Sequence, residues 1–162
     1  MPIPSKSALR DELVLLLTGD LQTAQRAHET AQAGATHEEA KPENDKDTRA
    51  LEASYLARGQ AARVEELRAA VVETKAMMLR EFVAAQPAAL GALVAAEEED
   101  KDAPTLFFIA PHGGGAKLAG GAVLVVTPRS PLGQALLGKR VDDACEVRLA
   151  GRTRELTVVA VS

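Results

Sequence analysis

The charged segment at residues 36–48, which reads THEEAKPENDKDT, most constrains how this chain can fold. It separates two long alanine-rich stretches. Pro42 lacks a backbone N–H and ends a helix, so the flanking stretches can fold back on each other with this segment at the tip. Five carboxylates against two lysines give the segment a formal charge of −5 + 2 = −3. A rigid arm that ends in carboxylates is suited to presenting acid inside a partner.

A heptad-like spacing predicts two long helices, at residues 5–36 and 47–84. Because the connection is short, we expect antiparallel neighbours that form an arm roughly 45 Å long at 1.5 Å per residue. A compact helical bundle is the alternative, which the single narrow seam of each helix disfavours. The first seam is Val14, Leu17, Leu21, Ala24, His28, Ala31 and Ala35, and the second is Ala50, Ala53, Ala57, Gln60, Val64, Leu67, Val71, Thr74 and Met78.

The composition favours close helix packing and excludes some functions. Of 162 residues, 46% are hydrophobic but only 2% are aromatic, and small side chains suit close helix–helix contact better than a thick core. The net charge of −4 argues against unaided binding to duplex DNA, which needs a concentrated basic face. The single cysteine, Cys145, cannot form an internal disulfide and predicts a reduced, cytoplasmic protein. The sequence shows no signal-peptide core and no apolar run near the ~18 residues of a membrane span.

The sequence changes character after the second helical stretch. Residues 85–104 are expected to form a linker or first strand, and their acidic run at 97–100 is expected to face solvent. Short apolar runs then predict strands at 105–109, 123–126, 145–149 and 156–161, with 93–95 a further candidate. A short helix is expected over 130–139, with Ser130 as N-cap, Pro131 at its first position and Gly138 at its C-terminal cap. The predicted fold class is α+β, with a helical hairpin at 1–84 and a small, mainly antiparallel sheet domain at 105–162.

The stretch VVTPRSPLGQALLGK at 125–139 closely resembles the signature of the GreA/GreB transcript cleavage factors, in which a Ser-Pro-aliphatic-small run leads into Ala-Leu-aliphatic-Gly-Lys. The segments at 141–147 and 151–161 are similar to the end of the family's FKBP-like C-terminal domain. KPEN at 41–44 is similar to the family's tip motif, and ARGQAARV at 57–64 to the start of its returning helix. The resemblance covers nearly the whole chain in the same domain order.

This resemblance implies a transcription elongation factor that binds RNA polymerase. The globular domain would dock at the rim of the secondary channel, and the coiled coil would enter it and reach the nascent RNA 3′ end. Acidic tip residues would help to hold a Mg²⁺ shared with the polymerase, whose own active site cleaves backtracked RNA. The chain would be an accessory factor and not an enzyme, with no cofactor of its own, no membrane contact and a monomeric state.

The site residues follow from the same resemblance. The tip residues expected to assist catalysis are Glu43, Glu39 and Asn44, with Glu43 and Glu39 sharing the Mg²⁺. The residues expected to support polymerase binding are Ser130, Pro131, Leu132, Gly133, Leu136, Gly138 and Lys139.

The tip departs from the family pattern. Placing Glu43 and Asn44 on the family's Glu-Asn puts Ala40 where the family has Asp, and Pro42 alters the turn. Glu39 is adjacent and could substitute if the turn is reshaped. Two functions therefore stay open, a factor that stimulates cleavage and a regulatory or inhibitory channel binder that does not. A coiled-coil adaptor unrelated to transcription is a third, which the C-terminal signature disfavours.

Other motifs have simpler interpretations. Asp45 and Asp47 can equally cap the second helix. The HGGG run at 112–115 matches an oxyanion-hole motif, but without a Gly-x-Ser-x-Gly elbow it indicates a loop between strands. Cys145 is expected to be a small core residue. His28 and His37, nine residues apart, do not share a helical face at ligand spacing and are expected to be structural or exposed. Arg49, Arg58 and Arg63 are expected to face solvent, with polymerase or RNA contact as the alternative.

Overall fold

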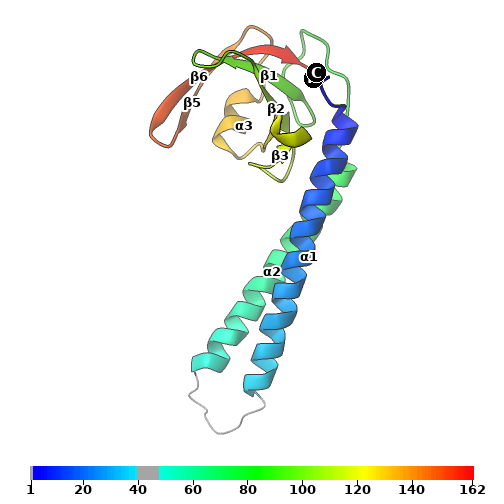
Figure 1. Ribbon diagram of the computed structural model, residues 1–162, viewed down its shortest axis with the longest axis vertical. Coiled ribbons are helices and arrows are strands. Elements are labelled where there is room, and N and C mark those ends of the chain that lie inside the picture. The colour runs from blue at the N-terminus through cyan, green and yellow to red at the C-terminus, as the bar shows by residue number, and fades with distance from the viewer. Residues whose placement is uncertain (1, 40–47) are drawn as a thin grey trace. The chain divides into compact units, whose positions relative to one another are not determined.

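The computed structural model describes residues 2–39 and 48–162, without the side chains of 35–39. The chain divides into two compact units, one of Met1–Val14 with Glu73–Ser162 and one of Leu15–Val72. Two helices, α1 (Lys6–Glu39) and α2 (Thr48–Ala76), run side by side as a hairpin (Figure 1). The Leu15–Val72 unit contains most of both helices. No helix within the described ranges is both long and apolar enough to cross a membrane.

The predicted helix seams form the contact between α1 and α2. Ala24, Val64 and Leu67 are buried in one cluster, against which Leu21 packs. Nδ1 of His28 lies 3.2 Å from the carbonyl oxygen of Ala57 on the facing helix. A narrow line of small and aliphatic side chains therefore joins the helices, as the heptad spacing predicts.

The second helix ends eight residues before the predicted boundary, at Ala76 instead of residue 84. The amide of Met77 bonds to the carbonyl of Thr74 at 3.3 Å, which tightens the last turn. Met78 was placed on the seam, but it is 80% exposed, and Met77 is buried instead. Because Phe82 enters the core of the sheet domain, tertiary packing overrides a helical preference that continues in the local sequence.

The sheet domain has six strands in the order β3-β4-β2-β1-β6-β5. The pairings are antiparallel except that of β2 with β4, which is parallel. The prediction of a mainly antiparallel sheet is confirmed, while the parallel pair and the two-residue β3 were not predicted. The strands are β1 (Leu93–Glu98), β2 (Thr105–Ile109), β3 (Lys117–Leu118), β4 (Val123–Val126), β5 (Ala144–Leu149) and β6 (Arg152–Val161).

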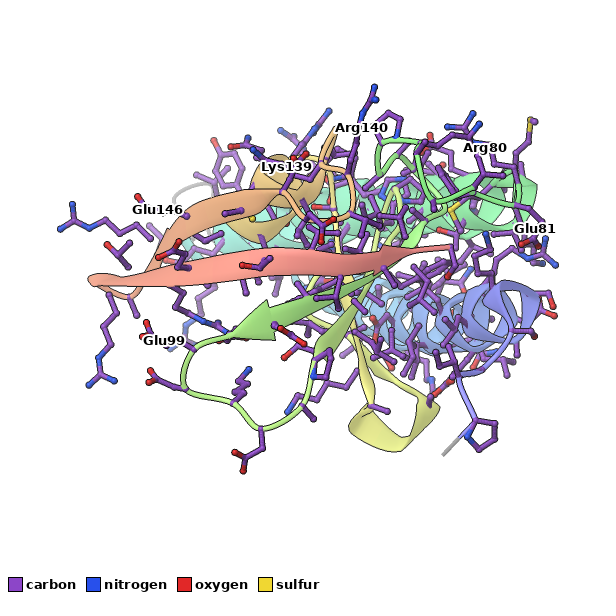
Figure 2. The ribbon with its side chains drawn as sticks, turned by 90° about the horizontal axis from the view of Figure 1, so that it is seen from above. Arg80, Glu81, Glu99, Lys139, Arg140 and Glu146 are labelled. Carbon is purple, nitrogen blue, oxygen red and sulfur yellow. The ribbon has the colours of Figure 1, made fainter. Side chains whose placement is uncertain are left out.

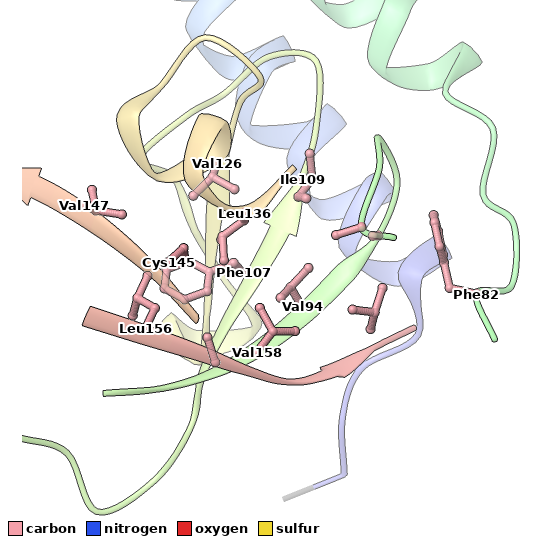
Figure 3. Close-up of a cluster of buried hydrophobic side chains, with 14 residues drawn as sticks. Phe82, Val94, Phe107, Ile109, Val126, Leu136, Cys145, Val147, Leu156 and Val158 are labelled. Atoms are coloured by element: carbon pink, nitrogen blue, oxygen red, sulfur yellow. The ribbon is translucent and has the colours of Figure 1, made fainter. Parts of the chain in front are cut away.

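The core of this domain lies between the sheet and the short helix α3 (Pro131–Leu136). Figure 3 shows Leu136, Phe107 and Leu156 gathered there, and these side chains are at most 1% exposed. Cys145 belongs to the same cluster, which confirms its prediction as a core residue. Burial raises the pKa of its thiol, and nearby Lys139 opposes that rise.

The acidic run at 97–100 is not wholly a solvent-facing turn, because β1 extends through Glu98. The Glu98 side chain is only 9% exposed and pairs with both Arg154 and Lys101. Nε of Arg154 donates to one carboxylate oxygen at 3.0 Å, and Nζ of Lys101 donates to the other at 2.7 Å. Burial by itself would raise the pKa of Glu98, but the hydrogen bonds and charges of these two cations outweigh it and lower the pKa.

Candidate functional site

The signature at 125–139 begins with a capped turn. Ser130 Oγ accepts hydrogen bonds from the amides of Gly133 at 3.0 Å and Thr127 at 3.3 Å. The same hydroxyl donates to the carbonyl of Thr127 at 2.9 Å. Pro131 then occupies the first turn of α3, where its missing N–H has no helical partner to lose. The predicted N-cap is therefore confirmed, and it connects β4 to α3 through one hydroxyl.

Gly133 permits α3 to approach the preceding turn closely. A Cβ at this position would lie 1.7 Å from the carbonyl oxygen of Thr127, so no larger residue fits. One helical turn later, Leu136 is fully buried in the core. The Ser-Pro-Leu-Gly run thus sets the position of α3 on the sheet.

The end of α3 is fastened to the segment before β1. Gly138 has φ +78°, which favours glycine, and its amide donates to the carbonyl of Ala88 at 2.8 Å. The amide of Ala88 donates in turn to the carbonyl of Lys139 at 2.7 Å. α3 itself stops at Leu136, three residues before the predicted end.

The predicted polymerase-binding residues differ in exposure. Gly133 and Leu136 are buried, Ser130, Leu132 and Lys139 are half-buried, and Pro131 and Gly138 are exposed. Most of them build the domain, and their role in binding stays a prediction.

Exposed polar residues surround α3, and the sequence alone did not indicate them as site residues. Arg129, Gln134 and Arg140 are exposed at the two ends and on the open side of α3. Lys139 and Arg140 lie together after α3 (Figure 2). No side-chain ion pair is present for Arg129, Lys139 or Arg140 among the residues that the structure covers. Their position close to the predicted caps of this helix was the one feature of the sequence that could have identified them as exposed candidates for binding.

The HGGG run at 112–115 is a loop between β2 and β3, as predicted, and it packs against the start of α1. A Cβ on Gly113 would lie 2.6 Å from Cδ1 of Leu13, and this glycine has φ +83°. Nε2 of His112 lies 2.5 Å from a carboxylate oxygen of Glu73. The Glu12 carboxylate accepts the amide of Ala119 at 2.9 and 3.2 Å. This loop is therefore a structural contact within its unit.

A second contact in the same unit surrounds Phe82. The cations of Lys6 and Arg80 lie 5.0 and 4.7 Å from its ring centre. Nζ of Lys6 also donates to the carbonyl of Arg80. Burial lowers the pKa of Lys6, with Glu81 raising it and Arg80 lowering it further.

The arginines of the hairpin lie on its exposed surface. Arg63 is 3.5 Å from Glu66, and the Arg58 guanidinium lies 5.6 Å from the ring centre of Tyr55. Arg49 is exposed as well. The solvent-facing interpretation of these three residues is confirmed, while a role in contacting polymerase or RNA stays a prediction. The structural interpretation of His28 is confirmed by its contact with Ala57.

The predicted catalytic tip lies outside the described residues. This holds for Glu43, Asn44, Ala40, Pro42, Asp45 and Asp47, and the side chains of Glu39 and His37 are likewise not described. The shared Mg²⁺ expected at Glu43 and Glu39 therefore stays a prediction. Within residues 2–34 and 48–162, no group of three or more His, Cys, Asp or Glu side chains is placed to hold a metal ion. The structure does place the helix ends, Glu39 and Thr48, on either side of this segment.

Solved structures with a similar chain are GreA factor homologues and a GreA/GreB factor. GreA factor homolog 1 of Thermus thermophilus is 19% identical, covering 92% of this chain and 94% of its own, with a TM-score of 0.41. The homologue from Thermus aquaticus is 22% identical, covering 90% of each chain, with a TM-score of 0.41. The elongation factor GreA/GreB of Nitrosomonas europaea is 17% identical, covering 61% of this chain and 78% of its own, with a TM-score of 0.39. With TM-scores below 0.5, these likenesses add no weight to a family assignment.

The family assignment rests on the sheet domain. No curated protein matches the sequence. Residues 86–162 match the family described as "Transcription elongation factor, GreA/GreB, C-term". This match includes the capped turn, α3 and the strands that enclose the core. Residues 86–162 of this chain therefore form a GreA/GreB C-terminal domain.

Proposed function

We propose that this chain is an elongation factor that binds RNA polymerase, inserts its helical hairpin into the secondary channel and stimulates cleavage of backtracked RNA. The observation that supports this most is the pairing of a GreA/GreB C-terminal domain with two long helices joined by a segment of net charge −3. The part of α1 within the hairpin unit, residues 15–39, is roughly 37 Å long at 1.5 Å per residue. Such an arm can carry carboxylates deep into a partner.

The chain would act as an accessory factor in this reaction. Mg²⁺ binds through one or two carboxylates and keeps several of its waters, so a tip with few acids suits a metal shared with another protein. Glu43 and Glu39 are the proposed ligands, with Asn44 beside them. The polymerase would supply the remaining ligands and perform the hydrolysis.

A cleavage assay on backtracked elongation complexes tests this proposal. RNA labelled at its 5′ end is followed with purified polymerase, with and without the factor, and we expect the factor to accelerate shortening of the RNA. Glu43→Gln keeps the shape of the side chain and removes its charge, so it should abolish the acceleration and leave polymerase binding intact. Glu29→Gln, at an exposed position on α1, is the matched control and should keep full activity. Loss of activity in both variants, or in neither, would contradict a specific role for Glu43.

The second candidate is a channel binder that inhibits or regulates without cleavage, and the alanine at position 40 favours it. In this case the wild-type chain should slow nucleotide addition and stimulate no cleavage. The Glu43→Gln variant should slow nucleotide addition to the same extent. Ala40→Asp distinguishes the two functions further. It should raise cleavage if the tip otherwise keeps the family geometry, and Glu39→Gln should lower cleavage only if Glu39 replaces the missing acid.

Docking is proposed to use the exposed surface around α3. Because Gly133 and Leu136 are buried, direct contact falls to their exposed neighbours, above all Arg129 and Arg140. Reversing both charges should weaken binding to polymerase without lowering the melting temperature. Arg152→Glu, in the turn-proximal part of β6, is the exposed control. Unchanged binding of the double variant would exclude this surface.

A further inference from the structure

Strand β5 leaves one edge of the sheet open. It is the last strand in the sheet order and pairs with β6 alone. The amide of Val158 donates to the carbonyl of Asp143 at 2.9 Å, and Ala144 is opposite Thr157 in the register. Since hydrogen-bonded pairs alternate along an antiparallel ladder, Cys145, Val147 and Leu149 direct their N–H and C=O groups toward β6.

The next residues along β5 direct their backbone groups the other way. Ala144, Glu146 and Arg148 therefore present N–H and C=O groups at the open edge, and no backbone hydrogen bond from another described segment reaches them. The tight turn after β5, with φ +51° at Ala150 and +77° at Gly151, fits the same alternation, because such turns close on a hydrogen-bonded pair. An unpaired edge of this kind is a template for another strand.

The side chains at this edge carry opposite charges two positions apart. Glu146 and Arg148 are exposed on one face of β5, whereas Cys145 and Val147 are buried on the other. Neither charge forms an ion pair with a described residue. Glu146 lies directly opposite Glu155 of β6, an arrangement of like charges that destabilises a sheet. Figure 2 shows Glu146 on β5, away from Arg80 and Glu81.

We propose that β5 pairs antiparallel with β5 of a second copy of this chain, with Val147 facing Val147 at the two-fold axis. Glu146 then lies directly opposite Arg148 of the second copy, and the same pair repeats across the axis. The outward backbone groups of both residues form the hydrogen-bonded pairs of the new ladder. The guanidinium of Arg148 from the second copy would also lie beside Glu146 and offset the repulsion between Glu146 and Glu155.

The charge pattern selects this register over its neighbours. Centring the pair on Glu146 would place Glu146 against itself, and centring it on Arg148 would place two arginines together. Shifting one strand by a single residue would set outward backbone groups against inward ones, so the ladder could not form. Because the interface is short and its ion pairs are exposed, the dimer is expected to be weak and to weaken further in high salt.

Analytical ultracentrifugation of charge variants tests the proposal. Wild-type chain should dimerise increasingly with protein concentration at low salt and less at high salt. Glu146→Arg and Arg148→Glu each place like charges across the axis, so each variant alone should remain monomeric. The double swap, Glu146→Arg with Arg148→Glu, should restore the dimer. An equimolar mixture of the two single variants should form the heterodimer, since every pair in it is complementary.

A control variant and three contrary results complete the test of the dimer. Glu97→Arg reverses an exposed acid on the interior strand β1 and should leave dimerisation unchanged. If one single variant melts early, the double swap and the mixture still report the pairing. Wild-type chain that stays monomeric at every concentration, or single variants that dimerise as the wild type does, would overturn the proposal. A mixture of the two single variants that fails to associate would overturn the proposal as well. If the charges served only to prevent pairing at this edge, combining the complementary variants would not restore the dimer.

Discussion

Replacing Gly133 by alanine should destabilise the sheet domain strongly. The new Cβ would lie 1.7 Å from the carbonyl oxygen of Thr127 and 2.6 Å from its carbonyl carbon, and both neighbouring atoms are backbone. Overpacking a well-packed site costs about 1–3 kcal/mol, and here the clash cannot be relieved by a rotamer change. Moving the Thr127 carbonyl also disturbs its bonds with the amide and hydroxyl of Ser130, whose cap contributes about 1 kcal/mol. We therefore expect the free energy of unfolding to fall by about 2–4 kcal/mol.

Gly59→Ala is the matched control for this change. Gly59 lies inside α2, and a Cβ there meets nothing within 4 Å. The same substitution should therefore stabilise the hairpin by about 1 kcal/mol through helix propensity. Urea unfolding followed by amide NMR signals of each unit measures the two effects separately, which matters because the chain has two compact units. A Gly133→Ala protein within about 1 kcal/mol of wild type would refute the close approach of α3 to Thr127.

Three further changes test the packing and charges of the structure. The Thr74 hydroxyl is fully buried and bonds to no described group, so Thr74→Val should stabilise the chain by about 1 kcal/mol in urea unfolding, whereas Thr74→Ser, which keeps the hydroxyl, should not. The pKa of Glu98 in the folded state is lowered from 4.5, so its contribution to the free energy of unfolding is complete above that pH and is lost as the pH falls through the folded pKa. Glu98→Gln should therefore flatten the decline of the urea midpoint at acid pH. An unchanged slope would contradict the pairing of Glu98 with Arg154. Ala57→Leu should overpack the seam beside His28 and cost about 1–3 kcal/mol, and an unaltered melting curve would place Ala57 outside the helix contact.

The sequence alone determined the class of the fold and much of its local structure. Heptad spacing located both helices, and the apolar runs located the main strands, because these patterns report which side of a single element is buried. The N-cap at Ser130 followed from residue chemistry within four positions. The family resemblance, found in the Ser-Pro-Leu-Gly run, was confirmed by the match over residues 86–162.

The candidate site was predicted only in part. The signature residues were identified, but their division into buried supports such as Leu136 and exposed neighbours such as Arg129 needed the packed structure. The assignment of Glu43, Glu39 and Asn44 to the tip chemistry stays a prediction from the resemblance. The local sequence does not show which of these side chains are exposed to a partner, because the segments that pack around α3 determine their exposure.

Tertiary structure alone decided the features that join distant segments. α2 ends at Ala76 because Phe82 is needed in a core built mostly from the strands that follow it. Glu98 leaves the solvent-facing acidic run because Arg154, 56 positions later, bonds to it from the neighbouring strand. Gly113 is fixed against Leu13, a hundred positions before it. Local sequence encodes periodicity and capping, whereas these outcomes depend on contacts that form only when remote parts of the chain meet.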